Sequence, residues 1–368
     1  MWIRGPWWDG FWVLSGVPIG IILWGALWLD PSMPLAFLAT VLLSIAHAVA
    51  PIALAWGHKG FHSIMRPHPV KYVIAPLSIL LGATALGAVT AETADFSLGP
   101  SLLGMEINDA WALRNPFVIL GLVYVLWNAY HFGMQNFGVM SIYRHKALTG
   151  DPRQRRIDLN YCVFVTWATM LIPFIPHLAK GSHDIIGWPS AAHPFLEYVH
   201  SLYVATALVL IVAMIMWELR LGFCVPRLLF IAINGLGMVA ALWFGLWGFA
   251  IVAINHWLVA IGLASHVYST NRGRLMSLTA GGLIVIGVLI FGLLFCVRYQ
   301  NLFYLHLLFP YFGWKVVWNA VYPVSTQVTM VALGFRIGLG FVHFLYDRYI
   351  YKFSDPVVRA TIGKDMGF

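Results

Sequence analysis

The sequence predicts an all-helical integral membrane protein, a polytopic bundle of about ten transmembrane helices. Hydrophobic residues make up 60% of the 368 residues and charged residues only 10%, whereas about 25% is usual for a soluble domain. The mean hydropathy of +0.80 agrees with a bilayer protein. The 17 Trp and 15 Tyr residues suit aromatic belts at the two membrane interfaces.

Apolar runs of suitable length define the individual helices, since a spanning helix needs about 20 mostly apolar residues. Ten such runs are predicted, at about 11–29, 34–56, 72–91, 116–140, 159–178, 196–217, 228–246, 249–269, 277–297 and 324–346. The aromatic, amphipathic segment 298–323 is expected to lie along the outer interface. Neither a repeat nor a low-complexity linker divides the chain, so residues 1–368 are predicted to form a single domain.

The distribution of Lys and Arg sets the predicted orientation. Most of the 22 basic residues fall in loops on one side, and the opposite loops contain only Arg114, Lys180, Arg298 and Lys315. Cytoplasmic loops of membrane proteins are enriched in Lys and Arg. We therefore expect both termini in the cytoplasm and the chain in a bacterial cytoplasmic membrane. The net charge of +8 is then explained by topology and lipid contact, so nucleic acid is not expected as a partner.

Four polar residues on four different helices are predicted to lie near the middle of the bilayer. At a rise of about 1.5 Å per residue, His47, His131 and Arg336 lie roughly 14 to 16 Å from the cytoplasmic helix ends, and His256 about 20 Å. The hydrocarbon core is about 30 Å thick. Because imidazole is the commonest metal ligand, the shared depth of these histidines predicts a metal site. Interhelical hydrogen bonding is the structural alternative for each of them.

A second group is expected at the cytoplasmic mouth, where further candidate metal ligands are His58, His62, His266 and His343. His58 and His62 are four residues apart, as are His343 and Asp347, and on a helix this spacing puts both side chains on one face. A solvated or lipid-headgroup role is equally open for His58 and His62. A histidine near a helix C-terminus is also favoured by the helix dipole, which is the alternative for His343.

Three further residues are candidates for catalytic roles. Arg336 is expected to clamp a carboxylate, a propionate or a substrate head group, because a buried Arg in lipid normally faces a cavity or a partner. A structural ion pair is its alternative. Gln135 lies one turn after His131 and could hydrogen-bond a ligand, and Asp347 could orient His343 or bind the metal with it.

The segment containing His131-Phe132-Gly133 resembles the bacterial Brp/Blh-like group of multi-helix membrane proteins, which also has an intramembrane histidine in a His-Phe-Gly context. This chain is longer than is usual for that group, and Gln135 or Asn136 stands where an acidic residue is expected. The resemblance implies an iron-dependent oxygenase that cleaves a carotenoid. Membrane desaturases, which use histidine boxes, fit less well because the sequence has no HxxHH box.

These observations favour a metal-dependent membrane oxidoreductase or oxygenase acting on a lipid or isoprenoid substrate. Iron is the expected metal, although imidazole-rich sites suit copper and zinc as well. A second hypothesis is a quinone-linked electron-transfer protein in which His47 and His131 hold haem b and Arg336 lies near a propionate. A transporter or an accessory subunit of a larger membrane complex is the non-enzymatic alternative. Nucleotide chemistry is not supported, because the sequence has no P-loop and no dinucleotide-binding motif.

Overall fold

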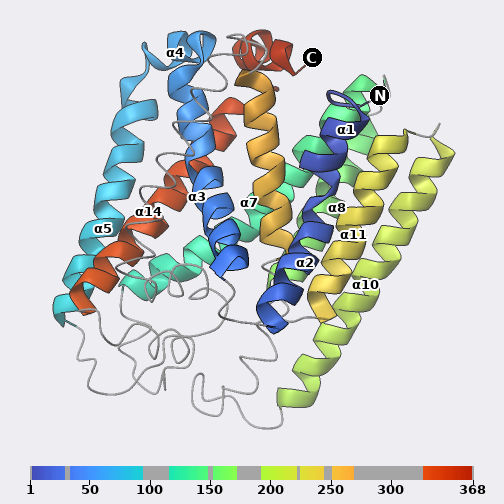
Figure 1. The fold of residues 1–368 in the computed structure, drawn as a ribbon, viewed down its shortest axis with the longest axis horizontal. Coiled ribbons are helices and arrows are strands. Elements are labelled where there is room, and N and C mark those ends of the chain that lie inside the picture. The colour runs from blue at the N-terminus through green and yellow to red at the C-terminus, as the bar shows by residue number, and fades with distance from the viewer. Residues whose placement is uncertain are drawn as a thin grey trace.

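Long helices run up and down the molecule in alternate directions, and the N- and C-terminal segments lie at the same end of the bundle (Figure 1). The structure is a computed structural model that describes residues 2–29, 34–93, 116–147, 152–171, 192–221, 224–243, 251–268 and 326–366. These residues are helical apart from short turns and connections. The all-helical fold expected from the sequence is therefore confirmed.

The N-terminal half contains α1 (Pro6–Asp9), η1 (Gly10–Leu14), α2 (Gly16–Leu29), α3 (Pro34–Gly57), α4 (Lys59–Met65), η2 (Val70–Ile74), α5 (Ala75–Thr93), α7 (Pro116–Lys146) and α8 (Pro152–Leu171). The C-terminal half contains α10 (Ala192–Arg220), α11 (Val225–Trp243), the helix Ile251–Tyr268, α14 (Thr326–Ile350), α15 (Pro356–Val358) and η4 (Arg359–Gly363). We refer to Ile251–Tyr268 as the central helix. The predicted segments 277–297 and 298–323 lie outside the described residues.

Three of the described helices are long and apolar enough to cross a membrane: Val70–Thr90, Ser201–Arg220 and the central helix. Only 22% of the residues in each of the first two are buried, and their exposed side chains include Leu81 at 58% and Val209 at 66%. In the central helix 83% are buried. Two of these helices thus expose apolar side chains, and the third is enclosed by the protein. This pattern fits a bundle surrounded by lipid.

Glycine pairs spaced four residues apart bring neighbouring helices into close contact. A Cβ atom at Gly334 of α14 would overlap the carbonyl oxygen of Ala83 in α5, and one at Gly338 would lie 3.0 Å from the Cα of Leu80. Gly16 and Gly20 of α2 lie equally close to the central helix, where a Cβ atom would overlap Asn255 and Ile251, respectively. Small residues at this spacing are the usual means of close packing in membranes. These contacts fix α14 and the central helix in the bundle.

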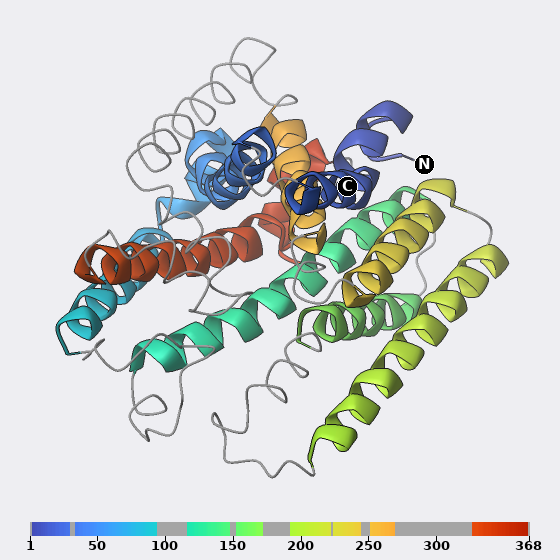
Figure 2. The same ribbon diagram turned by 60° about the horizontal axis from the view of Figure 1, so that its bottom comes forward.

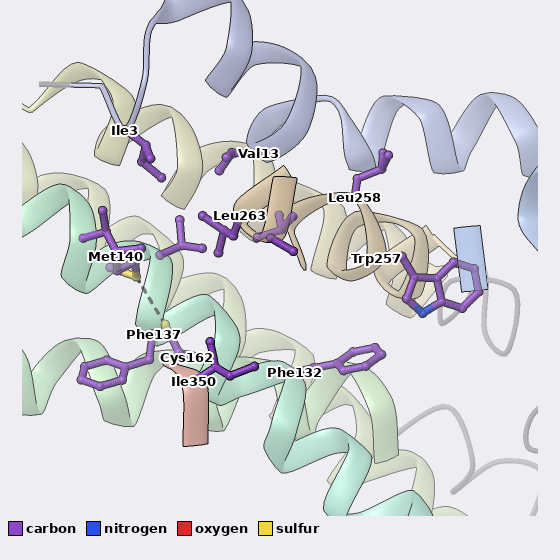
Figure 3. Packing of buried hydrophobic residues seen from close by; sticks show 14 of the residues in the cluster. Ile3, Val13, Phe132, Phe137, Met140, Cys162, Trp257, Leu258, Leu263 and Ile350 are labelled. Atoms are coloured by element: carbon purple, nitrogen blue, oxygen red, sulfur yellow. Dashed lines mark hydrogen bonds between the residues drawn. The ribbon is translucent and has the colours of Figure 1, made fainter. Parts of the chain in front are cut away.

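The central helix packs against α7 through apolar side chains, and α7 packs in turn against α8. Figure 3 shows Leu258 and Leu263 from the central helix and Phe137 and Met140 from α7, with a dashed line joining Met140 to Cys162 of α8. The sulfur atoms of that pair are 3.3 Å apart. The second view of the ribbon shows α7 running obliquely between α8 and α14 (Figure 2). This tilt lets one helix contact both sides of the bundle.

A buried ion cluster joins α7, α8, α10 and α11. Arg227, fully buried, donates to both carboxylate oxygens of Asp158 at 2.6 and 2.9 Å and to Glu218 at 2.6 Å. Arg144 pairs with Asp158 at 3.3 Å, so two positive and two negative charges balance. The predicted helix 228–246 begins after Arg227, so the sequence places this residue in a loop. The structure instead places it inside the bundle, where its loss would leave two buried carboxylates without their main partner.

We expect Arg227→Ala to lower the free energy of unfolding by about 3–5 kcal/mol, because removing one partner strands the other charges. The measurement is thermal unfolding of the purified protein in detergent. Arg155→Ala is the matched control, since Arg155 is exposed on α8 and exposed substitutions usually change stability by less than about 0.5 kcal/mol. Equal stability of the two variants would show that the cluster contributes nothing.

Candidate metal centre

Four histidines from four helices converge inside the bundle. His47 comes from α3, His131 from α7, His256 from the central helix and His343 from α14. All four are buried, with 2–7% of their surface exposed. Each offers a ring nitrogen, and these four atoms all lie within 4.8 Å of one another. Such a cluster could hold a metal ion, although the identity of the ion does not follow from the histidines alone.

The distances between the ring nitrogens match those of ligands around one ion. His256 Nε2 lies 3.2 Å from His47 Nε2, and His343 Nε2 lies 3.3 Å from His131 Nε2. With a metal–nitrogen bond of about 2.1 Å, neighbouring ligands are about 3.4 Å apart in a tetrahedral site and about 3.0 Å apart in an octahedral one. A cation could therefore be bound with little movement of these pairs.

The four rings form a closed circuit in which each imidazole contacts two others. The ring centroids of His47 and His343 are 4.0 Å apart, and those of His343 and His131 are 5.1 Å apart. The circuit closes from His131 to His256 at 4.9 Å and from His256 to His47 at 4.5 Å. Interplanar angles of 64–83° put the rings edge-on to their neighbours. The rings therefore do not stack face to face, and one nitrogen of each ring lies within 4.8 Å of those of the other three.

Two His-Phe dipeptides supply part of the wall around this circuit. Phe132, which follows His131, stacks on the ring of His256 with centroids 3.8 Å apart and an interplanar angle of 23°. Phe344, which follows His343, packs against the ring of His131 at 4.5 Å. Each phenylalanine thus covers a histidine from a different helix. The apolar rings restrict the orientations of the imidazoles and exclude water from one side of them.

Asp347, one helical turn after His343, adds a carboxylate to the cluster. Its Oδ2 atom lies 3.4 Å from His131 Nε2 and 3.5 Å from His343 Nε2. Its Oδ1 atom is buried without a hydrogen-bond partner among the described residues. Gln135 contributes differently, because its Nε2 atom donates a hydrogen bond of 3.0 Å to the backbone carbonyl of His256. That bond joins α7 to the central helix at His256.

Arg336 lies on the same helix as His343 but seven residues before it, roughly 10 Å along the axis. Its side chain is half-buried, and its positive charge acts on His47 and His343. The sequence predicts Arg336 at the depth of His47 and His343 at the cytoplasmic mouth. The structure corrects this placement, because His343 is the residue that lies directly against His47.

The structure does not place the other predicted metal ligands in the four-histidine cluster. His58 caps α4 by accepting from the backbone N–H of Phe61, and its Nε2 lies 2.9 Å from Asp365. His62 is exposed to the outside of the bundle. His266 is buried beside Trp8, with ring centroids 5.4 Å apart. His58 and His62 therefore lie at α4, outside the four-histidine cluster.

No family model, curated protein or solved structure matches the chain.

We expect the purified protein to bind close to one equivalent of a transition metal and His131→Ala or His343→Ala to lose most of it. Elemental analysis on protein purified from metal-supplemented cells provides the measurement. His62→Ala is the matched control, because it removes an exposed imidazole outside the cluster. A folded, metal-free wild-type protein would contradict the assignment, and so would equal metal content in all the variants.

Proposed function

We propose that the protein is a metal-dependent oxidoreductase or oxygenase of a bacterial cytoplasmic membrane, with about ten transmembrane helices, that acts on a lipid or isoprenoid substrate. The observation that carries the proposal is the convergence of four buried imidazoles on one point. Iron is the metal we expect. When bound, the ion would activate oxygen or polarise the substrate.

The Nε2 atoms of the four histidines face one another in two pairs, and this arrangement favours a cation over hydrogen bonding alone. A hydrogen bond within each pair would use one nitrogen as the donor and the other as the acceptor. A cation would accept a lone pair from all four nitrogens at once, which agrees with four ring nitrogens that lie within 4.8 Å of one another. The facing nitrogens therefore support a metal-binding role.

The donor chemistry favours a redox metal over a structural one. Among the described residues the cluster combines imidazoles with a nearby carboxylate and contains no thiolate, whereas closed structural zinc sites usually contain cysteine. Imidazole and carboxylate ligands are the set used by non-haem iron enzymes that react with oxygen. The four ligands also come from four separate helices, so that the ion would be enclosed by the bundle rather than exposed at its surface.

The surroundings favour an apolar substrate. Phe132 and Phe344 cover two of the histidine rings, and the central helix that carries His256 is largely buried. A water-soluble substrate would have to leave water to reach this site, whereas a lipid or isoprenoid could arrive laterally from the bilayer. Arg336, which is half-buried, would bind an anionic head group. The resemblance of His131-Phe132-Gly133 to the Brp/Blh-like group supports an isoprenoid of the carotenoid type.

The geometry favours a metal ion over haem b. If His47 and His131 were axial ligands, a porphyrin would have to lie between them. The imidazoles of His256 and His343 each contact both of those rings and occupy that space. An absorption spectrum without a Soret band is therefore expected for the purified, metal-loaded protein.

We expect iron-loaded protein in lipid bilayers to incorporate oxygen from isotope-labelled oxygen gas into an apolar product when supplied with a bacterial lipid extract containing isoprenoids. Mass spectrometry of the extracted lipids detects the product. His131→Ala should give none, and His62→Ala should match the wild type. Iron-loaded wild-type protein that neither consumes oxygen nor labels any lipid would contradict the oxygenase proposal while leaving the metal site intact.

The proposed topology predicts that a green fluorescent protein fused after Met366 fluoresces and that alkaline phosphatase fused at the same place is inactive. The last described segment lies at the same end of the bundle as α4, which follows His58 (Figure 1). Phosphatase inserted between residues 94 and 115 should be active, because that segment is predicted on the outer side. The reverse pattern would overturn the cytoplasmic orientation.

A further inference from the structure

The carboxylate of Asp347 lies against the Nε2 atoms of His131 and His343, which are the nitrogens that point to the centre of the cluster. Its Oδ2 atom is 3.4 Å from His131 Nε2 and 3.5 Å from His343 Nε2, and these two nitrogens are 3.3 Å apart. The three atoms form a nearly equilateral triangle. Around an ion with bonds of about 2.1 Å, adjacent ligands are separated by about 3.0–3.4 Å. The triangle therefore has the dimensions of one face of a coordination shell.

The choice of nitrogen distinguishes a ligand from a residue that merely orients a histidine. A carboxylate that orients a metal-bound histidine accepts a hydrogen bond from the ring nitrogen that does not bind the metal. In this cluster the Nε2 atoms of the four histidines face one another in two pairs. Asp347 contacts two of those Nε2 atoms. It is therefore placed on the metal's side of the rings.

We propose that Asp347 is a fifth protein ligand, and that His131, His343 and Asp347 form a two-histidine, one-carboxylate face completed by His47 and His256. This inference rests on the proposed metal centre and specifies its donor set. α14 supplies two of the five donors, because residues four apart lie on one face of a helix. α7 supplies His131, the third donor of this face.

The charge balance supports this donor set. Asp347 is 8% exposed, and its Oδ1 atom has no hydrogen-bond partner in the described part of the chain. An isolated carboxylate buried at membrane depth is costly. Binding to a divalent cation removes that cost directly. Four neutral imidazoles, one carboxylate and a divalent ion also leave a net charge of only one, compared with two for histidines alone.

Five protein donors constrain the substrate. An octahedral ion with five protein ligands has a single open position, and four histidines alone would leave two. One open position accepts oxygen or another small ligand but does not allow the substrate to chelate the metal. The reacting part of the substrate would therefore lie beside the ion while oxygen occupies the open position. This agrees with the phenylalanine rings that line the site.

The experiment counts the open positions on ferrous iron bound to the full-length protein in detergent. Nitric oxide is added first and isotope-labelled azide second, and electron paramagnetic resonance detects each ligand through its hyperfine coupling. We expect the wild type to bind nitric oxide alone. Wild-type protein that binds nitric oxide and azide together would overturn the proposal, because two positions would then be open. No ferrous nitrosyl signal in folded wild-type protein would overturn the metal centre itself, which is a distinguishable failure.

Asp347→Ala provides the second arm. It should open a second position, so that azide binds beside nitric oxide at least about tenfold more tightly than to the wild type, and iron affinity should fall by at least about tenfold. Asp347→Glu should restore single occupancy. Asp365→Ala, which removes the carboxylate that pairs with His58 outside the cluster, is the matched control and should behave as the wild type. An Asp347→Ala spectrum identical to that of the wild type would also overturn the proposal.

Discussion

The presence of four imidazoles and a carboxylate in the interior of an apolar bundle is the constraint on which the other features of this protein depend. Each of these groups loses water on burial, and the Nδ1 atoms of His47 and His256 and the Oδ1 atom of Asp347 gain no hydrogen-bond partner among the described residues. Polar groups in a membrane are retained mainly where they face each other or a ligand. Here they face each other at distances of 3.2–3.5 Å, which are the separations of ligands around one cation.

Keeping five donor atoms in register requires rigid contacts between helices that are distant in the chain. Close packing at Gly334 and Gly338 holds α14 against α5, so the position of His343 and Asp347 is set by backbone contact rather than by flexible side chains. Gln135 ties α7 to the carbonyl of His256. The ion cluster around Arg227 fixes the other end of α7 to α8, α10 and α11. A small shift in any of these helices would separate the nitrogens by more than a metal can bridge.

Part of this site follows from the sequence and part does not. Counting residues from the expected helix ends grouped His47, His131 and His256 correctly, because a few angstroms of error still leaves them at mid-bundle. The same count separated His343 from them. α14 continues to Ile350 and α7 to Lys146, so the helix ends are not level, and α7 is oblique (Figure 2). The pairing of Arg227 with Asp158 and Glu218 depends on how α8, α10 and α11 pack. Neither spacing nor composition contains that information.

X-ray absorption at the iron edge of the metal-loaded protein tests the central claim most directly, because it reports the atoms around the ion without requiring a substrate. We predict nitrogen and oxygen ligands at about 2.0–2.2 Å, together with the outer-shell scattering pattern of about four imidazoles. Sulfur ligation, or a spectrum that fits no more than one imidazole, would contradict a centre built from His47, His131, His256 and His343.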